Sequence, residues 1–438
     1  MKKVLMIAYI FPPMGGGGAI RTVKFAKYLP LFGWKPIVLT VMQGEAEYLD
    51  WDFYQEIRDR VSVYKTRTID LPLIYNQIRS NITENQQTRI LGGRIDAVLD
   101  IFKSFVNRWC LIPDSRIGWL PFAVLKGLRV IEKRSIDCIY STGGPWTDHL
   151  IGFFLKTYTG KPWVSDFRDF WTQDPNLRSM PTVRQRIEKY MERKVIECAD
   201  RVISVNKAIG DYFLQTYHVD EKKLVTISNG YDQEDLANLS KGKENKSLFH
   251  IVYTGSVNAH RTPVYLLRAL RQAINHYPDL KQKIRVSFIG TADEISLKEV
   301  EMLELGENVM FLGCRSHKEA ISYLFKANML LLLSYTGEYA EVNANVHLTG
   351  KIFEYLATGI PIFALAKRQS AIAKIVQQTR SGVVIEPENV KQIENALYDC
   401  YLKWHKGYLS IDPDWSLIRT FDRKELTRKL AATMDGLL

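Results

Sequence analysis

The stretch KKVLMIAYIFPPMGGGGAIRTVKF, residues 2–25, decides the fold class of this chain. An apolar run ends at two prolines and four consecutive glycines, and a segment with helical periodicity follows. Each glycine loses more backbone entropy on folding than any other residue, so four in a row indicate that another group approaches the backbone closely. The pattern predicts a buried strand, a glycine-rich turn and a helix, which is the first unit of a parallel α/β sheet.

Short apolar runs alternate with helix-length segments along the rest of the chain. Strands buried on both faces and separated by helices imply doubly wound parallel sheets. The polar segment LSKGKENKSLF, residues 239–249, divides the runs into two series, so we predict two Rossmann-like domains, 1–240 and 249–415. The predicted strands lie near Val4–Tyr9, Ile37–Val41, Cys138–Ser141, Trp163–Ser165, Val202–Val205, Val225–Ile227, Ile251–Thr254, Val286–Ile289, Val309–Leu312, Met329–Ser334, Ile362–Leu365 and Val383–Ile385.

Composition and length indicate a globular protein. The 438 residues are 46% hydrophobic and 24% charged, which excludes a disordered chain. No stretch reaches the roughly 18–20 apolar residues of a membrane span, and the opening run lacks the cleavage site of a signal peptide. The five cysteines have no metal-binding spacing, so we expect reduced thiols in a cytoplasmic protein.

The formal net charge of +11 raises the question of an anionic partner. In ILGGRIDAVLDIFKSFVNRWCLI, residues 90–112, basic and large apolar residues share a helical period. Such a helix suits peripheral contact with an anionic membrane, and an amphipathic helix packed on the protein's own core is the alternative. We expect no nucleic acid partner, because the chain has no basic run and no recognisable binding module.

The glycine-rich turn is the first candidate site, because ligands of such sheets bind at the carboxyl ends of the strands. Gly16, Gly17 and Gly18 precede a helix near residues 20–29, where free amides and the helix dipole attract phosphate. The turn has neither the G-x-G-x-x-G dinucleotide fingerprint nor a Walker lysine. A tight turn without a ligand remains an alternative.

Charged residues follow another strand of the first half, in KPWVSDFRDFW, residues 161–171. A carboxylate of Asp166 or Asp169 can position a substrate hydroxyl, and Arg168 can hold the carboxylates or a phosphate. A structural Arg–Asp clamp at the strand end explains the same residues. His149 lies a turn into a helix of the same predicted crevice, where a structural histidine is the simpler alternative.

The second half repeats the strand-then-glycine pattern in IVYTGSVNAHRTP, residues 251–263. Gly255 follows the strand directly, and Arg261 precedes the next helix. The position of both residues after a strand makes them candidates for the binding of an anion.

The segment NVHLTGKIFEYLATGIPIFAL, residues 345–365, predicts a helix that begins at Thr349 and Gly350. Their amides, together with Lys351, would form a second phosphate cradle. Glu354 can accept both hydroxyls of a ribose, and an i,i+3 salt bridge with Lys351 is the alternative.

Three of these segments resemble family 4 glycosyltransferases of the GT-B fold, of the type that builds bacterial surface polysaccharides. They are FPPMGGGGAIRTVKFAKYLPLFGW (11–34), PWVSDFRDFW (162–171) and TGKIFEYLATGIPI (349–362), and the pattern K-x-x-E-Y-x-A-x-G-x-P in the last is the most specific. The resemblance covers nearly the whole chain. It implies two Rossmann-like domains that face a central cleft, with a C-terminal helix, about residues 416–438, that crosses back to the first domain.

Under this resemblance the second domain holds a nucleoside-diphosphate sugar, with UDP as the expected nucleotide, and the first binds the acceptor. Glu354 matches the glutamate that binds the ribose, and Val346 stands where the family's E-x7-E pattern has another glutamate. The expected donor-binding residues are Gly16, Gly17, Gly18, Gly255, Thr349, Gly350 and Glu354. The expected catalytic residues are Arg261, Lys351, Asp169 and His149, with Asp166 and Arg168 on the acceptor side.

The reaction implied is a metal-independent, hexosyltransferase-like transfer with retention of configuration, to a hydroxyl of a glycan or lipid-linked acceptor. No cofactor is expected, and capsule, O-antigen or exopolysaccharide synthesis at the inner face of the plasma membrane is the implied setting. The D-x-D string at residues 50–52 lies in a helix-like stretch, so we predict no metal site there. A non-catalytic GT-B binding subunit and a nucleotide-sugar epimerase are the alternative functions.

Overall fold

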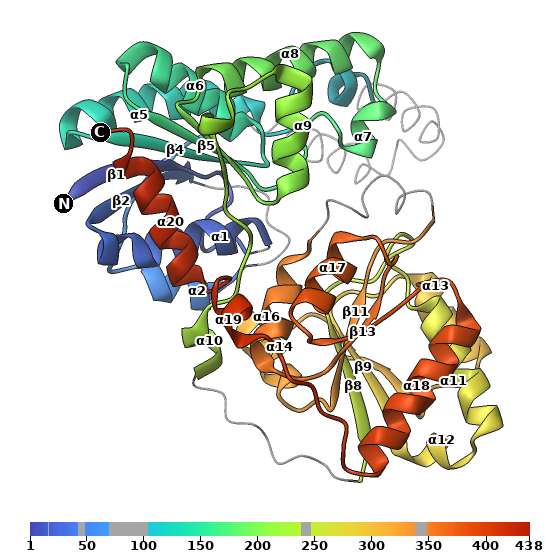
Figure 1. Ribbon diagram of the computed structural model, residues 1–438. Helices are drawn as coiled ribbons and strands as arrows, with labels where there is room; N and C mark the ends of the chain where they lie inside the picture. The colour runs from blue at the N-terminus through green and yellow to red at the C-terminus, as the bar shows by residue number, and fades with distance from the viewer. Residues whose placement is uncertain (16, 43–48, 70–103, 238–246, 338–347) are drawn as a thin grey trace, which may run out of the picture. The chain divides into compact units, whose positions relative to one another are not determined.

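The computed structural model describes residues 1–15, 17–42, 49–69, 104–237, 247–337 and 348–438 (Figure 1). Its contacts divide the chain into two compact units. Unit 1 comprises Met1–Ser228 and Thr427–Leu438, and unit 2 comprises Asn229–Leu426. Most of the predicted linker, residues 239–249, lies outside the described residues, as does most of the predicted helix at 90–112.

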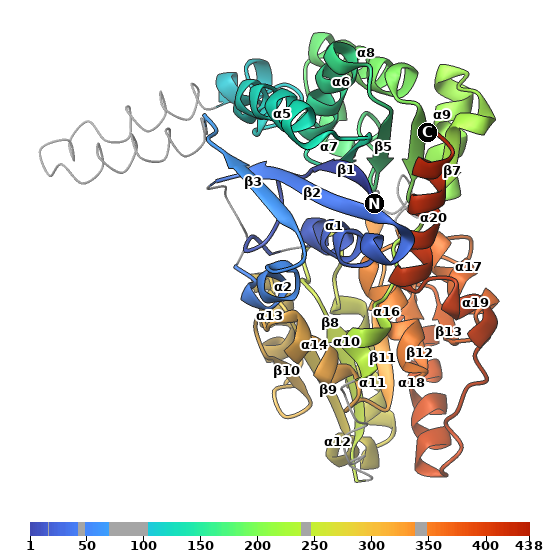
Figure 2. The ribbon, with the colours of Figure 1, turned by 90° about the vertical axis from the view of Figure 1, so that its left-hand side faces the viewer.

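The described residues of unit 1 form a seven-stranded parallel sheet in the order β3-β2-β1-β4-β5-β6-β7. Figure 2 shows α1 on one face of this sheet and α5 and α6 on the other. The strands are β1 (Lys2–Ile7), β2 (Trp34–Val41), β3 (Ser62–Thr66), β4 (Cys138–Gly143), β5 (Trp163–Phe167), β6 (Arg201–Ser204) and β7 (Leu224–Thr226). The helices are α1 (Gly17–Tyr28), α2 (Trp51–Ile57), α5 (Leu120–Arg134), α6 (Thr147–Thr159), α7 (Pro175–Arg178), α8 (Thr182–Cys198) and α9 (Lys207–Tyr217).

The described residues of unit 2 form a six-stranded parallel sheet in the order β10-β9-β8-β11-β12-β13. The strands are β8 (Phe249–Thr254), β9 (Ile284–Ile289), β10 (Val309–Phe311), β11 (Met329–Leu333), β12 (Ile362–Leu365) and β13 (Gly382–Ile385). The helices are α10 (Gln233–Ala237), α11 (Val264–His276), α12 (Asp279–Lys283), α13 (Glu294–Met302), α14 (His317–Leu324), α16 (Gly350–Thr358), α17 (Ala371–Gln378), α18 (Val390–His405) and α19 (Trp415–Arg419). The chain passes from unit 2 back into unit 1 within α20 (Arg423–Asp435).

The apolar runs that predicted strands form them, with boundaries that differ by at most three residues. Val4–Ile7 of β1 and all of β11 are buried, as the lack of polar alternation indicated. Two doubly wound parallel sheets confirm the predicted fold class. No helix in the described part of the chain is long and apolar enough to cross a membrane.

Strand β3 was not predicted. It lies at the edge of its sheet, paired only with β2, and its first residues are exposed. An edge strand with solvent on its outer side needs no continuous apolar run. The sequence SVYKT has no such run, so the pattern used for the other strands does not predict β3.

Candidate functional site

Asp166, at the end of β5, forms a buried ion pair with an arginine of α1. Arg21 donates from Nε and Nη2 to the two carboxylate oxygens at 2.7 and 2.9 Å, and the Tyr140 hydroxyl donates to one of them as well. Arg21 also donates to the carbonyl oxygens of Ile227 and Ser228, each at 2.8 Å. The ion-paired side chains are 1% and 0% exposed. The arginine of this pair is Arg21 and not Arg168, the arginine considered from the sequence, and the pair ties α1 to the ends of β5 and β7.

Arg168, just after β5, contacts the glycine-rich turn. Its guanidinium donates to the carbonyl oxygens of Gly18 and Gly144. A Cβ on Gly18 would lie 2.8 Å from Arg168 Nη2, so a larger residue would displace this guanidinium, whereas a Cβ on Gly17 would meet nothing within 4 Å. Gly16 lies outside the described residues. Within unit 1 the group close to Gly18 is therefore a protein side chain, and the binding of a donor by the glycines remains a prediction.

His149 lies on the first turn of α6 and is fully buried. Its Nδ1 is 2.8 Å from Ser141 Oγ, which also accepts a hydrogen bond from Trp163 Nε1 at 2.9 Å. In the described part of the chain its Nε2 has no hydrogen-bond partner, and it faces Gly143, where a Cβ would come within 2.6 Å. Burial lowers the pKa of His149 to about 3. A neutral imidazole nitrogen without a partner in the protein can either accept a hydrogen bond from a hydroxyl or donate one to it, depending on the tautomer.

The lowered pKa of His149 predicts a loss of stability in acid. The unfolded chain takes up this proton near the ordinary pKa of 6.5, and the folded chain does so only near 3, so the free energy of unfolding falls as the pH drops below 6.5. At pH 5 the loss amounts to about 2 kcal/mol. Urea unfolding at pH 7 and pH 5 should show it, and His149→Asn should show a smaller difference. An equal difference in both proteins would contradict the assignment.

Asp148 is a buried acid that was not among the candidate residues predicted from the sequence. Its Oδ2 accepts a hydrogen bond from the backbone N–H of Tyr9 at 3.0 Å, and its Oδ1 has no partner among the described residues. Burial raises the pKa of Asp148 well above its usual range. Its position next to His149 was the only sequence signal. The predicted residue Asp169, in contrast, is exposed two residues beyond β5.

Lys351 is the central cation of unit 2. Its Nζ donates to the Tyr253 hydroxyl at 2.9 Å and lies 4.1 Å from the centroid of that ring. Burial lowers the pKa of Lys351 well below its ordinary value, the charge of Arg261 lowers it further, and Glu354 opposes both. Gly255 has φ +115°, and a Cβ there would lie 2.2 Å from Lys351 Nζ, so only glycine fits.

Arg261 lies in a tight loop between β8 and α11. The backbone N–H of Asn258 donates to the carbonyl oxygen of Arg261 at 3.2 Å, and the reverse bond measures 3.0 Å. The Arg261 guanidinium carbon lies 4.7 Å from the centroid of the Tyr335 ring. These contacts hold the guanidinium at the same edge of the sheet as Lys351, whose pKa it lowers.

Glu354 lies on α16, with its side chain 19% exposed. Its Oε1 is 3.7 Å from His317 Nε2, which is also 3.5 Å from Asp235 Oδ2. Burial raises the pKa of Glu354, with His317 opposing this shift and Asp235 adding to it. No ion pair joins Glu354 to Lys351 in the described part of the chain, so the simple i,i+3 salt bridge is not what the structure contains. No local sequence pattern marks His317 or Asp235 as a site residue.

Helix α16 begins at this edge with Thr349 as its N-cap and Gly350 as its first residue. Thr349 Oγ1 caps no backbone amide and has no partner among the described residues, and Gly350 is exposed. Two cations, a carboxylate and a helix N-terminus therefore meet at the carboxyl edge of the unit 2 sheet. This arrangement can bind an anion through the cations and amides and a hydroxyl through the carboxylate.

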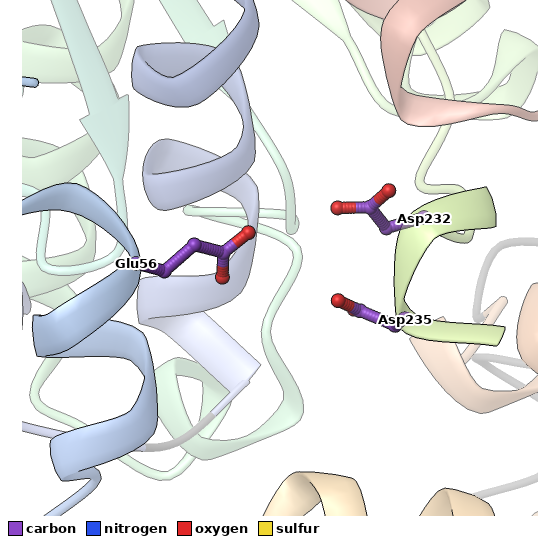
Figure 3. Close-up of side chains that lie close together, drawn as sticks. All are labelled: Glu56, Asp232 and Asp235. Carbon is purple, nitrogen blue, oxygen red and sulfur yellow. The ribbon is translucent and has the colours of Figure 1, made fainter. Parts of the chain in front are cut away.

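Carboxylates also gather near α10. Figure 3 shows the side chains of Asp232 and Asp235 extending from the same short segment of unit 2. Glu56, drawn in the same figure, belongs to unit 1, where it accepts hydrogen bonds from Lys24 and pairs with Lys27 at 2.6 Å. Within the described residues of either unit alone, no three potential metal ligands lie together, and we assign no metal ion to these side chains.

Two family models match the chain. Residues 15–235, about half of the 438, match the model described as Glycosyltransferase Family 4, and residues 249–402 match the model described as glycosyl transferases group 1.

Two curated relatives are D-inositol 3-phosphate glycosyltransferases. That of a Nocardioides species is 22% identical over 226 residues, 47% of each chain. That of Catenulispora acidiphila is 25% identical over 225 residues, 48% of this chain and 51% of the relative. The chain spans about half the length of these curated relatives.

Several solved structures share the whole architecture. A glycosyltransferase from Rickettsia africae aligns with a TM-score of 0.64 at 13% identity over 100% of this chain and 98% of that one. WaaG, a glycosyltransferase involved in lipopolysaccharide biosynthesis, gives 0.55 at 13% identity over 99% and 100%. An Escherichia coli trehalose-6-phosphate protein bound with UDP-2-fluoro glucose gives 0.61 at 11% identity over 100% of both chains. Identities this low establish the fold alone, and that fold is GT-B.

Proposed function

Because the chain belongs to glycosyltransferase family 4, we propose that it transfers a sugar from a nucleoside-diphosphate sugar to a hydroxyl of a glycan or lipid-linked acceptor. The observation that carries this proposal is the edge of unit 2, where Lys351 and Arg261 lie near Glu354 at the start of α16. A nucleoside diphosphate presents a ribose and two phosphates, which match the carboxylate and the cations. The named relatives and the GT-B structures support the same class of reaction.

The proposed chemistry needs no metal ion. When the bond between the sugar and the diphosphate breaks, negative charge grows on the phosphate oxygens and positive charge on the sugar ring. Lys351, Arg261 and the amides at the start of α16 stabilise the departing diphosphate. A phosphate oxygen of the donor takes the proton of the acceptor hydroxyl, and the sugar is transferred with retention of configuration.

We propose that unit 1 binds the acceptor. His149 is fully buried, so we propose that it serves this surface indirectly, through its contact with Gly143 at the end of β4. Asp169, which is exposed beyond β5, is available to an acceptor hydroxyl. Asp166 serves this surface indirectly, since both of its oxygens hold Arg21 and Tyr140. The synthesis of a bacterial surface polysaccharide is the setting that we propose.

A thermal-shift panel with UDP, GDP, dTDP, CDP and NAD, with and without a chelator, tests the proposed donor site. A ligand at about 100 times its Kd adds about 2.7 kcal/mol to the stability of the protein, which raises the melting temperature by several degrees. We expect one nucleoside diphosphate to do so with or without chelator. Glu354→Ala should abolish the shift, and Glu301→Ala, which removes an exposed carboxylate of α13 from the same unit, should retain it. No response to any nucleotide would overturn the proposed donor site.

A further inference from the structure

Two buried tyrosines link the end of β8 to the start of α16. Tyr253 is the next-to-last residue of β8, Tyr355 lies on α16, and both side chains are fully buried. A buried hydroxyl is costly unless it is hydrogen-bonded, so the partners of both hydroxyls are informative. The Tyr253 hydroxyl accepts a hydrogen bond from Lys351 Nζ and donates to the carbonyl oxygen of Ser256 at 3.0 Å. Tyr253 therefore joins Lys351 to the turn that follows β8.

Tyr355 fixes α16 at the point where the order of the strands reverses. Strand β8 is the first of unit 2, and it pairs with β9 on one side and with β11 on the other. The pairing with β11 ends at Val252, and two residues later the backbone N–H of Thr254 donates to the Tyr355 hydroxyl at 2.8 Å. Ligands of doubly wound sheets bind at such a reversal. Tyr355 therefore holds α16, and with it Lys351, beside this point of the sheet.

The contacts of Lys351 leave its charge uncancelled. Its Nζ is 2.9 Å from the Tyr253 hydroxyl oxygen and 4.1 Å from the centroid of the same ring, and among the described residues no carboxylate forms an ion pair with it. An ammonium group has three N–H donors, and Tyr253 takes one of them. The ring and the hydroxyl thus hold the cation in place, while its charge stays available to an anion.

The charged and titratable groups around Lys351 come from three segments. Burial lowers the pKa of Lys351, Arg261 in the loop after β8 lowers it further, and Glu354 on α16 raises it. Tyr335, which follows β11, lies with its ring against the Arg261 guanidinium. Burial raises the pKa of Tyr253 to about 12, so near neutral pH its hydroxyl is uncharged. This hydroxyl is therefore a neutral acceptor that favours the charged form of the lysine.

We propose that Tyr253 is the positioning residue of Lys351 and holds its ammonium group where the donor's diphosphate binds. The inference rests on the proposed function, because that function gives Lys351 the diphosphate as its ligand. It goes further by assigning a role to a side chain that is fully buried and acts on the donor only through Lys351. Without the hydroxyl, Nζ would lose its acceptor, although the ring would still fill the core.

Tyr253→Phe tests the proposal, because it removes the hydroxyl and keeps the ring. The probe is the nucleoside diphosphate among UDP, GDP, dTDP and CDP that gives the largest thermal shift. Because a hydrogen bond from a charged donor contributes a factor of about ten or more, Tyr253→Phe should bind this nucleotide at least about tenfold more weakly at pH 7. In a Lys351→Ala background the same substitution should weaken binding less than twofold, since the cation that Tyr253 positions is already absent.

A measurement without nucleotide separates the contact of Lys351 from its role. NMR spectroscopy of isotope-labelled lysine side chains follows the titration of Lys351, whose signal is the one missing from Lys351→Ala. The pH midpoint of this titration should be about one pH unit lower in Tyr253→Phe, because the lost hydrogen bond favoured the charged form. The affinity of Tyr253→Phe for the nucleotide should then fall at a correspondingly lower pH than that of the unchanged protein.

Tyr401→Phe is the matched control. It removes the hydroxyl of another buried tyrosine from the same hydrophobic core, on α18, and it should change nucleotide affinity less than twofold. Nucleotide binding by Tyr253→Phe as tight as that of this control would overturn the inference. An equal loss with and without Lys351 would overturn it too, because Tyr253 would then support the fold in general.

The NMR titration distinguishes a failure of the inference from a failure of the proposed function. If Lys351→Ala abolishes nucleotide binding but Tyr253→Phe leaves the lysine midpoint unchanged, the inference is wrong and the proposed donor site stands. If the midpoint falls as expected but Lys351→Ala binds nucleotide normally, the proposed diphosphate site is wrong, and the inference fails with it.

Discussion

Replacing Asp166 with alanine will lower the free energy of unfolding of unit 1 by about 3–5 kcal/mol. The change leaves the guanidinium of Arg21 buried without its carboxylate, and it removes the acceptor of the Tyr140 hydroxyl. An uncompensated buried charge is among the most destabilising changes that a single substitution makes. Urea unfolding followed by tryptophan fluorescence measures the effect, because Trp34 and Trp163 are fully buried in the same unit.

An exposed ion pair of the same unit provides the control. Glu197 of α8 pairs with Arg193 and Lys194 at 2.7 and 2.8 Å, close to the distances of the buried pair, but all three side chains are more than a third exposed. Glu197→Ala should therefore cost less than about 1 kcal/mol. Replacing Arg21 and Asp166 together with methionine and leucine should cost less than Asp166→Ala alone, since no charge stays buried. A similar loss for Asp166→Ala and Glu197→Ala would contradict the buried ion pair.

The second large effect concerns Lys351. Lys351→Ala should lower kcat/KM for the sugar donor at least about 100-fold, because the variant lacks a buried cation at the position proposed for the departing diphosphate. The pH dependence of donor binding gives an independent measurement. Burial lowers the pKa of Lys351 in the free protein, and a bound diphosphate favours the charged form, so binding takes up a proton. The donor affinity of the unchanged protein should therefore fall as the pH rises, whereas that of Lys351→Ala should stay flat.

Lys374, an exposed lysine of α17 in the same unit, is the matched control. Lys374→Ala removes a lysine charge that is not part of the proposed site at the start of α16, and it should change kcat/KM less than twofold. If Lys351→Ala retained a third or more of the activity, the assignment of Lys351 to the diphosphate would be wrong. A normal melting temperature for both variants would exclude misfolding as the cause of any loss.

The strands could be predicted because burial on both faces imposes a continuous apolar run. The runs MLLLL of β11 and VLMI of β1 can be recognised as strands without knowing which strands they pair with. The edge strand β3 could not be seen, because its neighbours determine its pairing more than its own side chains do. The two-unit GT-B architecture followed from the order of these runs and from the resemblance.

The sequence allowed several residues of the candidate site to be predicted, but not the side chains with which they pair. Asp166 stood out after its strand, yet its arginine comes from α1, 145 positions earlier, and no local pattern marks such a pair. The same holds for Tyr253 beside Lys351 and for His317 beside Glu354, which the tertiary fold brings together across 98 and 37 positions. Glycine was informative at Gly255, where φ is +115°, whereas at Gly18 the group close to the backbone is the side chain of Arg168.

The discontinuity of unit 1 has a consequence for how the protein is made. Asp435, the last residue of α20, accepts hydrogen bonds from Lys2 Nζ and from Trp34 Nε1, on the first two strands of the chain. A ribosome releases these strands hundreds of residues before Asp435 is synthesised, with the whole of unit 2 in between. During translation, the Trp34 indole N–H therefore cannot form its hydrogen bond with Asp435 until the last segment of the chain has been synthesised. Unit 1 begins first and is completed after unit 2.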